Sequence, residues 1–524
     1  MKTNLFSFLS RVSFILMLLV GCDALSQPLE VVIDHSTTYQ TIDGFGASDA
    51  WRCQFVGKNW PDEKKGGIAE LLFSKEFDDK GNPKGIGLSI WRYYLGAGST
   101  EQGNDSGIPN EWRRAESYLD ENGNYDWTKQ AGQYWFLKEA KRYGVEKFLA
   151  FTLAAPSFWA LNGKGHAAET NGRFNIKPDR LDDYSEYLAT VLEHFDGQGI
   201  SFDYLSPVNE PQWDWEKSTQ EGTPATNEDI SKFSKYLSED LHKRNLNTKL
   251  VVPEAADLRY LYSHFNKAER GNQISAFYDQ NSPYHISNLP RVEKTISGHS
   301  YFTTWPVDSL IGVRQKLNKE LKAKELAYWQ SEFCILEQTD DIGGGRPRDL
   351  GMDTALYVAR VIHADLTLAN ASSWQWWTAL TNADFKDGLI YLDTGIEDNM
   401  YDLQLLKNNG TYHESKLLWG LGNFSLFVRP GMKRVDVELI DDRTLSERYN
   451  SLMISAYQDD VKNEIVAVAV NYSDEDKSLR LSDKNLKFSK SYVTSHDKNL
   501  APVSVQDNEV LIPSRSIVTM LVKK

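Results

Sequence analysis

Residues 202–211 read Phe-Asp-Tyr-Leu-Ser-Pro-Val-Asn-Glu-Pro, a short strand-like run that ends in a carboxylate. Residues 326–333 repeat this arrangement as Leu-Ala-Tyr-Trp-Gln-Ser-Glu-Phe. In each segment one Glu stands where an apolar strand meets its loop, and burial there costs a carboxylate hydration that a surface Glu keeps. Each Glu alone is typical of a structural ion pair. Taken together, Glu210 and Glu332 are candidates for a functional pair.

Strand-like runs of this kind alternate with amphipathic, helix-like segments through residues 40–425. Eight strand-like runs are present, at 42–48, 87–95, 147–154, 202–208, 249–253, 295–301, 326–333 and 372–378. Helix-like segments lie between them, including 130–143, 181–195, 229–244, 311–323 and 352–369. The alternation predicts an α/β fold with a parallel sheet, and eight units predict a closed (β/α)8 TIM barrel.

The pattern changes near residue 433 to apolar residues at every second position, as in 451–457, 465–470 and 517–522. This period predicts a β-sandwich. The strand-like run 29–33 precedes the barrel, and we expect it to pair with the C-terminal sheet. The predicted organisation is a tether and first sandwich strand at 22–40, a barrel at 41–428 and a β-sandwich at 429–524.

The first 21 residues have the features of an export signal, with basic Lys2 and Arg11 before an apolar stretch too short to span a bilayer. The stretch ends in Leu19-Val20-Gly21-Cys22, which resembles the lipobox of bacterial lipoproteins. We expect lipidation of Cys22 and a lipid-anchored protein of the bacterial cell envelope, at the outer membrane or in the periplasm. The alternative is an ordinary cleaved signal and a secreted protein.

The composition narrows the range of partners. The chain has 73 acidic and 58 basic residues and a net charge of −15, which argues against nucleic acid and favours a neutral partner. Beyond Cys22 only Cys53 and Cys334 are present, which form neither a disulfide framework nor a spaced metal cluster. We expect no metal, no cofactor and a monomer that contacts a membrane only through its lipid anchor.

Two motifs around the candidate carboxylates carry a family resemblance. Ser-Pro-Val-Asn-Glu-Pro at 206–211 and Trp-Gln-Ser-Glu-Phe at 329–333 resemble the acid/base and nucleophile motifs of the retaining (β/α)8 glycosidases. Within that clan, the segments 43–47, 89–96 and 155–159 resemble glycoside hydrolase family 30, and the resemblance covers nearly the whole chain after the export signal. It implies a retaining β-glycoside hydrolase with Glu210 as acid/base, Glu332 as nucleophile and Asn209 bound to the sugar 2-hydroxyl.

The implied reaction is a double displacement between two carboxyl groups about 5 Å apart. Ionised Glu332 attacks the anomeric carbon while protonated Glu210 donates to the leaving oxygen. Glu210 then deprotonates water, so its pKa must be high in the free enzyme and fall once Glu332 is esterified. The product keeps the anomeric configuration of the substrate.

Four further residues are considered for supporting roles. The resemblance places Arg92 near the sugar or the nucleophile, and an ion pair that stabilises the barrel is the alternative. We expect Tyr301 to donate a hydrogen bond to Glu332, although a packing tyrosine fits the sequence as well. We interpret His299 as a structural histidine, because no matching carboxylate and histidine spacing suggests metal. Glu221 is a candidate either for binding a sugar hydroxyl or for capping a helix.

Tryptophans that follow or end predicted strands are candidates for sugar platforms. The substrate-binding candidates of this kind are Trp51, Trp159, Trp213, Trp215, Trp376 and Trp377. Trp374 and Trp376 share one face of the last strand and Trp377 points the other way. We favour Trp376 and Trp377 for the site because they lie nearest the end of the strand.

The loop at 212–222 resembles the branch of the family that includes endo-β-1,6-galactanases. We therefore rank β-1,6-galactan, from the side chains of arabinogalactan, as the first substrate. Relatives of the same fold act on β-1,6-glucan, glucuronoxylan and small β-xylosides or β-glucosides. Two other classes stay open, a transglycosylase with the same residues and a non-catalytic surface glycan-binding lipoprotein.

Overall fold

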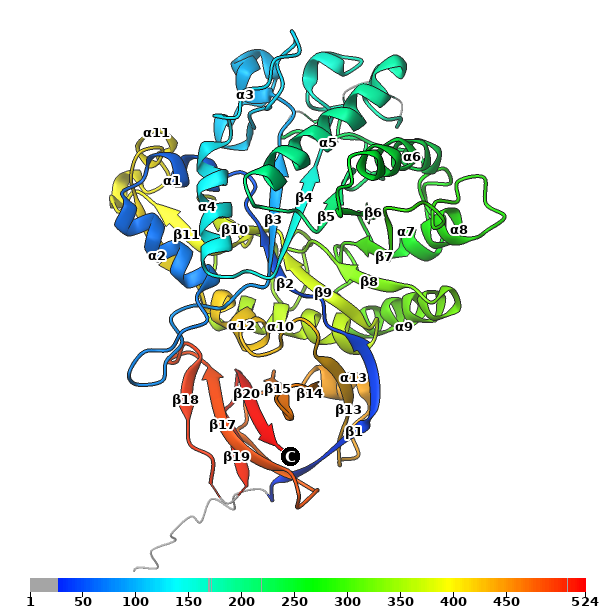
Figure 1. Ribbon diagram of the computed structural model, residues 1–524. Coiled ribbons are helices and arrows are strands. Elements are labelled where there is room, and N and C mark those ends of the chain that lie inside the picture. The colour runs from blue at the N-terminus through cyan, green and yellow to red at the C-terminus, as the bar shows by residue number, and fades with distance from the viewer. Residues whose placement is uncertain (1–26, 168–169, 171, 218, 507) are drawn as a thin grey trace, which may run out of the picture.

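The computed structural model describes residues 27–524 except 168–169, 171, 218 and 507, so Cys22 lies outside the described residues. A closed barrel of eight parallel strands occupies the centre of the larger part (Figure 1). The strands are β2 (Gly44–Ser48), β3 (Ile90–Leu95), β4 (Lys147–Thr152), β5 (Tyr204–Ser206), β6 (Lys249–Ala255), β7 (Val292–Gly298), β8 (Ala327–Gln330) and β9 (Ala371–Trp376). Each corresponds to one predicted run, and the pairing of β9 with β2 closes the barrel as predicted.

The barrel strands are buried on both faces, which explains their nearly continuous apolar sequences. Every residue of β3 is buried, including Arg92 among Trp91, Tyr93 and Tyr94. The principal helices of the outer ring are α4 (Ala131–Arg142), α5 (Leu181–Gly197), α6 (Asn227–Lys243), α9 (Val307–Lys324) and α10 (Met352–Thr367). Each of these helices corresponds to one of the predicted amphipathic segments.

Some elements have no counterpart among the predictions. Helices α1 (Cys53–Asn59) and α2 (Asp62–Phe73) follow β2, and a small sheet of β10 (Thr378–Thr381), β11 (Gly388–Asp393) and β12 (Thr411–Glu414) follows β9. Helix α1 packs tightly on α4 at Gly132. A Cβ there would lie only 1.8 Å from the Gln54 carbonyl oxygen, so the contact requires glycine. Shorter helices in the connections are α3 (Ser99–Gln102), η1 (Gly103–Ser106), η2 (Glu111–Arg113), η3 (Ser157–Trp159), η4 (Pro178–Arg180), α7 (Arg259–Tyr262), α8 (Gln273–Tyr278), η5 (Glu397–Asn399) and α11 (Leu403–Leu406).

The attached β domain is one hydrogen-bonded sheet of nine strands in the order β18-β17-β20-β15-β14-β13-β1-β16-β19. Its strands are β1 (Leu29–Thr41), β13 (Lys433–Leu439), β14 (Leu452–Asp459), β15 (Glu464–Asn471), β16 (Lys477–Leu481), β17 (Lys487–Thr494), β18 (Ala501–Val503), β19 (Glu509–Ile512) and β20 (Ser516–Lys523). The sheet folds back so that β19 contacts β17 and β20 around an apolar core. The N-terminal strand β1 pairs antiparallel with β13 and parallel with β16, as predicted.

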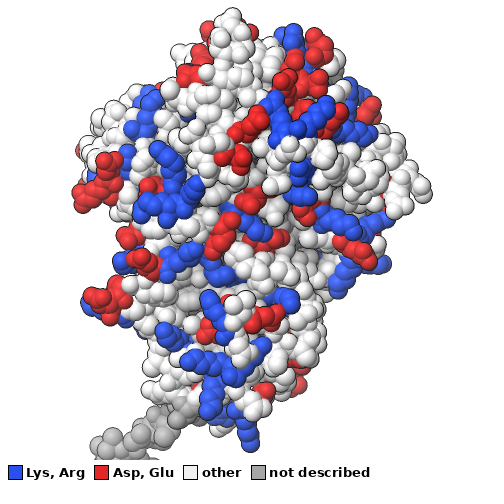
Figure 2. Space-filling view, viewed as in Figure 1, with Lys and Arg blue, Asp and Glu red and all other residues white. Residues whose placement is uncertain are grey.

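Helices α10 and α12 (Lys416–Ser425) lie between the barrel and the β domain (Figure 1). The short helix α13 (Leu445–Tyr449) also packs here, against α9. One apolar core includes residues of both parts, so the β domain is packed firmly on the barrel. Acidic and basic side chains are interspersed on the face in Figure 2. Within the described part of the chain, no helix combines the length and hydropathy needed to span a membrane.

Candidate active site

Glu210 and Glu332 lie just beyond the carboxyl ends of β5 and β8, at the end of the barrel where (β/α)8 enzymes assemble their sites. Both side chains border one pocket of about 320 Å3. Its lining residues are Arg113, Asn209, Glu210, Trp213, Trp215, Gln220, Tyr301, Glu332, Cys334, Leu336 and Trp377. An oxygen of Glu210 and an oxygen of Glu332 lie within 4.8 Å of each other. This separation fits the short spacing of retaining glycosidases and is shorter than the spacing of inverting enzymes.

The Glu332 carboxylate is held on both oxygens. Arg92 Nη1 donates to Oε2 at 2.6 Å, and the Tyr301 hydroxyl donates to Oε1 at 3.1 Å. Arg92 Nη2 also donates to Asn209 Oδ1 at 3.0 Å, and the guanidinium lies 3.8 Å from the Phe151 ring centroid. Because Arg92 has no exposed surface, it positions Glu332 and Asn209 from behind and does not itself meet the pocket.

A third buried carboxylate, Glu254, lies behind the pair and was missed in the sequence. It follows Val252-Pro253 at the end of β6. Like Glu210 and Glu332, it therefore stands where an apolar strand meets its loop. Ser206 Oγ donates to Oε1 of Glu254 at 2.5 Å, Ser331 donates to Oε2, and Arg92 Nη2 lies 3.7 Å from Oε2. Glu254 does not line this pocket and has no exposed surface, which makes it a support for the pair.

His299 bridges two of the carboxylates, a contact that the prediction of a structural histidine did not specify. Its Nδ1 lies 3.0 Å from Glu210 Oε1 and its Nε2 lies 3.0 Å from Glu254 Oε2. Glu210, His299 and Glu332 are spaced closely enough to hold a cation. Both ring nitrogens are already engaged by carboxylates, however, so His299 has no free lone pair for a metal. The expectation of no metal therefore stays a prediction with this physical support.

The pKa values of Glu210, Glu254 and His299 depend on their burial and on the charges of their neighbours. Burial raises the pKa of Glu210, and His299 offsets part of the rise. Burial alone would raise the pKa of Glu254, but Arg92 and His299 outweigh it and bring that pKa to about 2. Burial would lower the pKa of His299, but Glu332, Glu210 and Glu254 raise it to about 9. The carboxyl groups of Glu210, Glu254 and Glu332 thus face the cations of Arg92 and His299. These five side chains together are neutral when Glu210 holds a proton.

The Glu254→Gln variant is expected to be less stable than the wild type by about 3 kcal/mol, because it leaves buried Arg92 and His299 without one of their partners. Glu254 has a pKa lowered from 4.5 to about 2, so its contribution is complete above pH 4.5 and is lost as the pH falls toward 2. His299 has a pKa raised from 6.5 to about 9, so its contribution is complete below pH 6.5 and is lost as the pH rises through 9. The stability gap should therefore be widest between these limits.

Urea unfolding at pH values of about 3, 5.5 and 9.5 measures this gap. Glu216→Gln is the matched control, because Glu216 is exposed on the loop after β5. The control should follow the wild type at every pH. A gap between Glu254→Gln and the wild type that stays constant across the range would contradict the assigned charges.

Three of the candidate platform tryptophans border the pocket. Trp377 is 8% exposed and lines it, and Trp215 donates from Nε1 to the Glu210 carbonyl at 3.2 Å. Gly222 is required beside Trp215, because a Cβ there would lie 2.4 Å from the ring. Trp213 stands on the rim, 44% exposed, with the Phe302 ring 6.0 Å away and nearly perpendicular. These rings offer the apolar faces that sugar C–H groups stack on.

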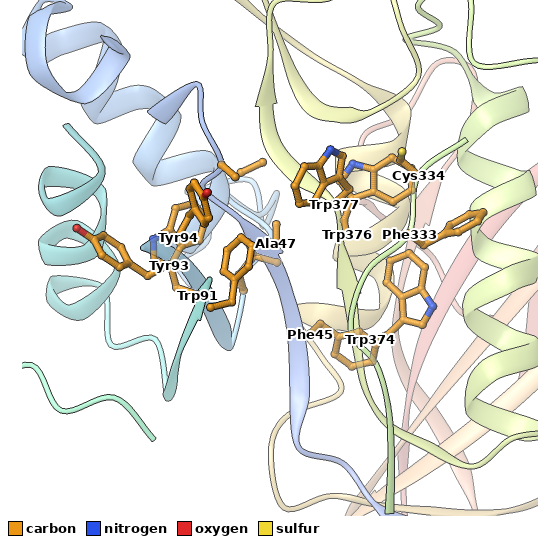
Figure 3. Close-up of a cluster of buried hydrophobic side chains, with 14 of the residues drawn as sticks. Phe45, Ala47, Trp91, Tyr93, Tyr94, Phe333, Cys334, Trp374, Trp376 and Trp377 are labelled. Carbon is orange, nitrogen blue, oxygen red and sulfur yellow. The ribbon is translucent and has the colours of Figure 1, made fainter. Parts of the chain in front are cut away.

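The other candidate tryptophans do not line the pocket. Trp376 has no exposed surface, packs against Phe333 and Trp374 (Figure 3) and does not line the pocket, so the expected platform role is wrong for this residue. Trp159 packs against Phe158 and Tyr187 outside the pocket lining. Trp51 is 2% exposed and lies edge-on to Trp377, which it supports from behind.

Glu221 anchors the loop that carries Trp213 and Trp215. Its buried carboxylate accepts from the backbone N–H groups of Ala97 and Ser99 at 2.9 and 3.0 Å, and from the Tyr94 hydroxyl. These bonds tie the loop after β5 to the loop after β3. Of the two roles considered from the sequence, capping is the one present, and no atom of Glu221 lines the pocket.

Replacing Trp213 by Ala is expected to raise KM for a polymeric substrate about tenfold, the loss of about 1.4 kcal/mol of stacking. Because Trp213 is on the rim, kcat and the KM for a short aryl glycoside should change little. Steady-state kinetics on both substrate sizes measures this difference, with Phe265→Ala as control for an exposed aromatic residue outside the pocket. An unchanged KM for the polymer contradicts the platform role.

The chain is similar to known proteins over most of its length. The model of O-glycosyl hydrolase family 30 matches residues 28–391, which include every strand of the barrel and both candidate carboxylates. A solved structure described as a conserved exported protein from Bacteroides fragilis is similar with a TM-score of 0.89 and 38% identity, over 94% of this chain and 100% of that one.

Two relatives of known activity are more distant. Glucuronoxylanase XynC from Bacillus subtilis is 24% identical over 78% of this chain and 80% of its own length. Exo-beta-1,6-galactobiohydrolase from Bifidobacterium longum is 19% identical over 71% of this chain and 30% of its own length.

Proposed function

The chain belongs to O-glycosyl hydrolase family 30 and is a retaining glycoside hydrolase, and on that premise we propose that Glu332 is its nucleophile and Glu210 its acid/base in the cleavage of β-1,6-galactan. The observation that carries the assignment is the pair of buried carboxylates within 4.8 Å at the carboxyl ends of β5 and β8. In the free enzyme Arg92 and Tyr301 hold the Glu332 carboxylate, and burial raises the pKa of Glu210, which favours its protonated form.

In the first step Glu332 attacks the anomeric carbon from the face opposite the leaving group. Glu210 gives its proton to the leaving oxygen, and a covalent glycosyl-enzyme forms. Asn209 borders the same pocket, and its Oδ1 is occupied by Arg92. Its side-chain N–H groups therefore remain to donate to the 2-hydroxyl of the sugar at the cleavage point.

The second step depends on the charge balance of the group. Esterification removes the negative charge of Glu332 in the same step in which Glu210 gives its proton to the leaving oxygen, so the net charge of these side chains stays zero with Glu210 ionised. Loss of the Glu332 charge lowers the pKa of Glu210, and His299 stabilises the Glu210 carboxylate. Glu210 becomes the base that deprotonates the attacking water, and the product retains the β configuration.

Support for β-1,6-galactan comes from the loop 212–222, which carries Trp213 and Trp215 at the pocket. The loop resembles the endo-β-1,6-galactanase branch. One relative is named exo-beta-1,6-galactobiohydrolase, so the relatives of this chain include an enzyme named for this linkage. Trp213 on the rim extends the binding surface beyond the pocket, as a chain-cleaving enzyme requires.

The proposal predicts that arabinogalactan freed of its arabinose releases β-1,6-galacto-oligosaccharides of several lengths on incubation with the protein. Sizing the products over time separates cleavage within the chain from release of a single short product. A panel of β-1,6-glucan, glucuronoxylan and aryl β-glycosides serves as the comparison. Release from one of these glycans and none from galactan would overturn the galactan assignment while leaving the catalytic pair in place.

A further inference from the structure

A second pocket, of about 260 Å3, lies where the barrel meets the β domain. Its walls come from α9 and α10 of the barrel and from β1, β13, β14 and α13 below them (Figure 1). Two of its residues, Lys322 and Asn370, stand just before β8 and β9. The pocket therefore lies at the end of the barrel opposite to the catalytic pair, which follows the carboxyl ends of the strands.

Arg434 on β13 is a buried cation in the wall of this pocket. It is 6% exposed, and its guanidinium lies 3.7 Å from the centroid of the Tyr39 ring. Nε donates to Gln40 Oε1 at 3.1 Å and Nη2 donates to Asn370 Oδ1 at 2.8 Å, so both acceptors are neutral amides. Asp436 lines the same pocket, but its carboxylate accepts from the Tyr39 hydroxyl at 2.9 Å. Among the described residues, no carboxylate forms an ion pair with Arg434, and Nη1 makes no hydrogen bond.

His363 on α10 is the second buried polar group of the pocket. It is 5% exposed, its ring lies 5.4 Å from the Tyr449 ring, and its Nδ1 is shielded from solvent and has no hydrogen-bond partner. Burial and the charge of Arg434 lower the pKa of His363 to about 3, so the imidazole is neutral near pH 7 and carries one N–H. A buried polar group without a partner costs free energy, because its hydrogen bonds to water are lost on folding. Arg434 and His363 thus leave hydrogen bonds unmade at one pocket.

We propose that this pocket binds a small organic carboxylate, whose oxygens accept from Arg434 and His363. The guanidinium has Nη1 available and the imidazole has its N–H, and a carboxylate can accept from both at once. Lys322 is exposed at the edge of the pocket and adds positive charge. Apolar side chains such as Val437 and Leu445 line other parts of the wall and can contact a carbon frame. The pocket is smaller than the roughly 300–1,000 Å3 of sites for drug-sized ligands, so the acid must be compact.

Water is the competing occupant, and it meets only part of the need. Water can complete the hydrogen bonds of Arg434 and His363, as it does in polar cavities of many proteins. It leaves the buried guanidinium with neutral partners only, and Gln40 and Asn370 already supply partners of that kind. A carboxylate also supplies the charge that a buried cation requires. Because the acid would contact α10 and β13 together, it should stabilise the junction between the barrel and the β domain.

The test is isothermal titration calorimetry of the protein with acetate, butyrate and benzoate, each compared with its neutral amide. The two members of a pair have nearly the same shape and differ in charge. The wild type is expected to bind at least one acid with a Kd of about 1 mM or lower, and the matched amide at least about tenfold more weakly. Inorganic phosphate and sulfate have no carbon frame to contact the apolar wall and should bind more weakly than that acid.

Three variants locate the binding. Arg434→Gln should abolish it by removing the cation. Leu445→Trp should abolish it by filling the pocket, and it leaves the buried polar groups unchanged because Leu445 is 40% exposed at the wall. Val461→Trp is the matched control and should bind as the wild type does, because Val461 is 95% exposed between β14 and β15 and outside the pocket lining. Leu445→Trp decides the case if Arg434→Gln fails to fold.

The inference is overturned if every acid binds with a Kd above about 1 mM, or if the matched amides bind within about tenfold of the acids. Tighter binding of phosphate or sulfate than of every acid would also overturn it, because the ligand would then not be an organic carboxylate. Unchanged binding in Leu445→Trp would place the acid elsewhere on the protein and has the same consequence. Because this pocket is at the other end of the barrel from Glu210 and Glu332, the result does not depend on which glycan the protein cleaves.

Discussion

Glu332→Ala is expected to lower kcat at least about 10,000-fold, because no other group on that side of the pocket can form the glycosyl-enzyme. The fold should survive, since Arg92 keeps Glu254 and Asn209 as partners. Steady-state kinetics on the best glycan, together with thermal unfolding, measures both effects. Glu216→Ala is the matched control and should retain wild-type activity, because Glu216 is exposed and does not line the catalytic pocket.

Azide gives the Glu332→Ala experiment a second readout. In the space left by the side chain, azide can attack the anomeric carbon while Glu210 still protonates the leaving group. The expected product is an α-glycosyl azide, with inverted configuration, and partial recovery of the rate on an activated aryl glycoside. Near-normal hydrolysis by Glu332→Ala, or a β-glycosyl azide as its product, contradicts the assignment of Glu332.

Glu210→Ala is the second substitution with a large expected effect, and that effect should depend on the leaving group. Natural glycans need protonation of the leaving oxygen, so their kcat/KM should fall about 1,000-fold or more. Aryl glycosides with acidic phenols need no acid, so their first step should persist and the glycosyl-enzyme should accumulate. Pre-steady-state kinetics should then record a burst of phenol followed by slow turnover.

The Glu210 experiment separates the acid/base from a residue that merely holds the pocket open. Azide should speed the second step of Glu210→Ala and give a β-glycosyl azide, because the nucleophile is intact. Equal losses on natural and activated substrates, with no response to azide, would assign Glu210 a structural role.

The barrel could be predicted in detail because its strands are buried on both faces and read as short apolar runs between amphipathic helices. The strand 29–33 was also placed in the C-terminal sheet on its pattern alone. The small sheet of β10, β11 and β12 escaped prediction for a physical reason. Strand β12 is largely exposed, and β10 is only four residues long, so neither carries a clear hydrophobic period.

The catalytic pair could be predicted from the sequence, but the roles of Glu254 and His299, which hold it in place, could not. Glu254 carries the same signal as Glu210 and Glu332, an apolar strand that ends in a carboxylate. The role of His299 depends on where β5, β6 and β7 place their ends in space, and no spacing along the chain encodes that arrangement.

Tryptophan roles depend on which face of a strand turns inward. Trp374 and Trp376 were correctly assigned to one face of β9, but parity alone does not say whether that face meets the pocket or the surrounding helices.

The most direct test of the account is to trap the covalent intermediate on the nucleophile. An activated 2-deoxy-2-fluoro-β-glycoside of the sugar that the protein cleaves slows both steps and lets the glycosyl-enzyme accumulate. Digestion and peptide mass spectrometry then identify the modified residue. The account predicts one fluorosugar per molecule, as an ester on Glu332, with activity lost in parallel with labelling. A label on another residue, or inactivation without any covalent sugar, would contradict it.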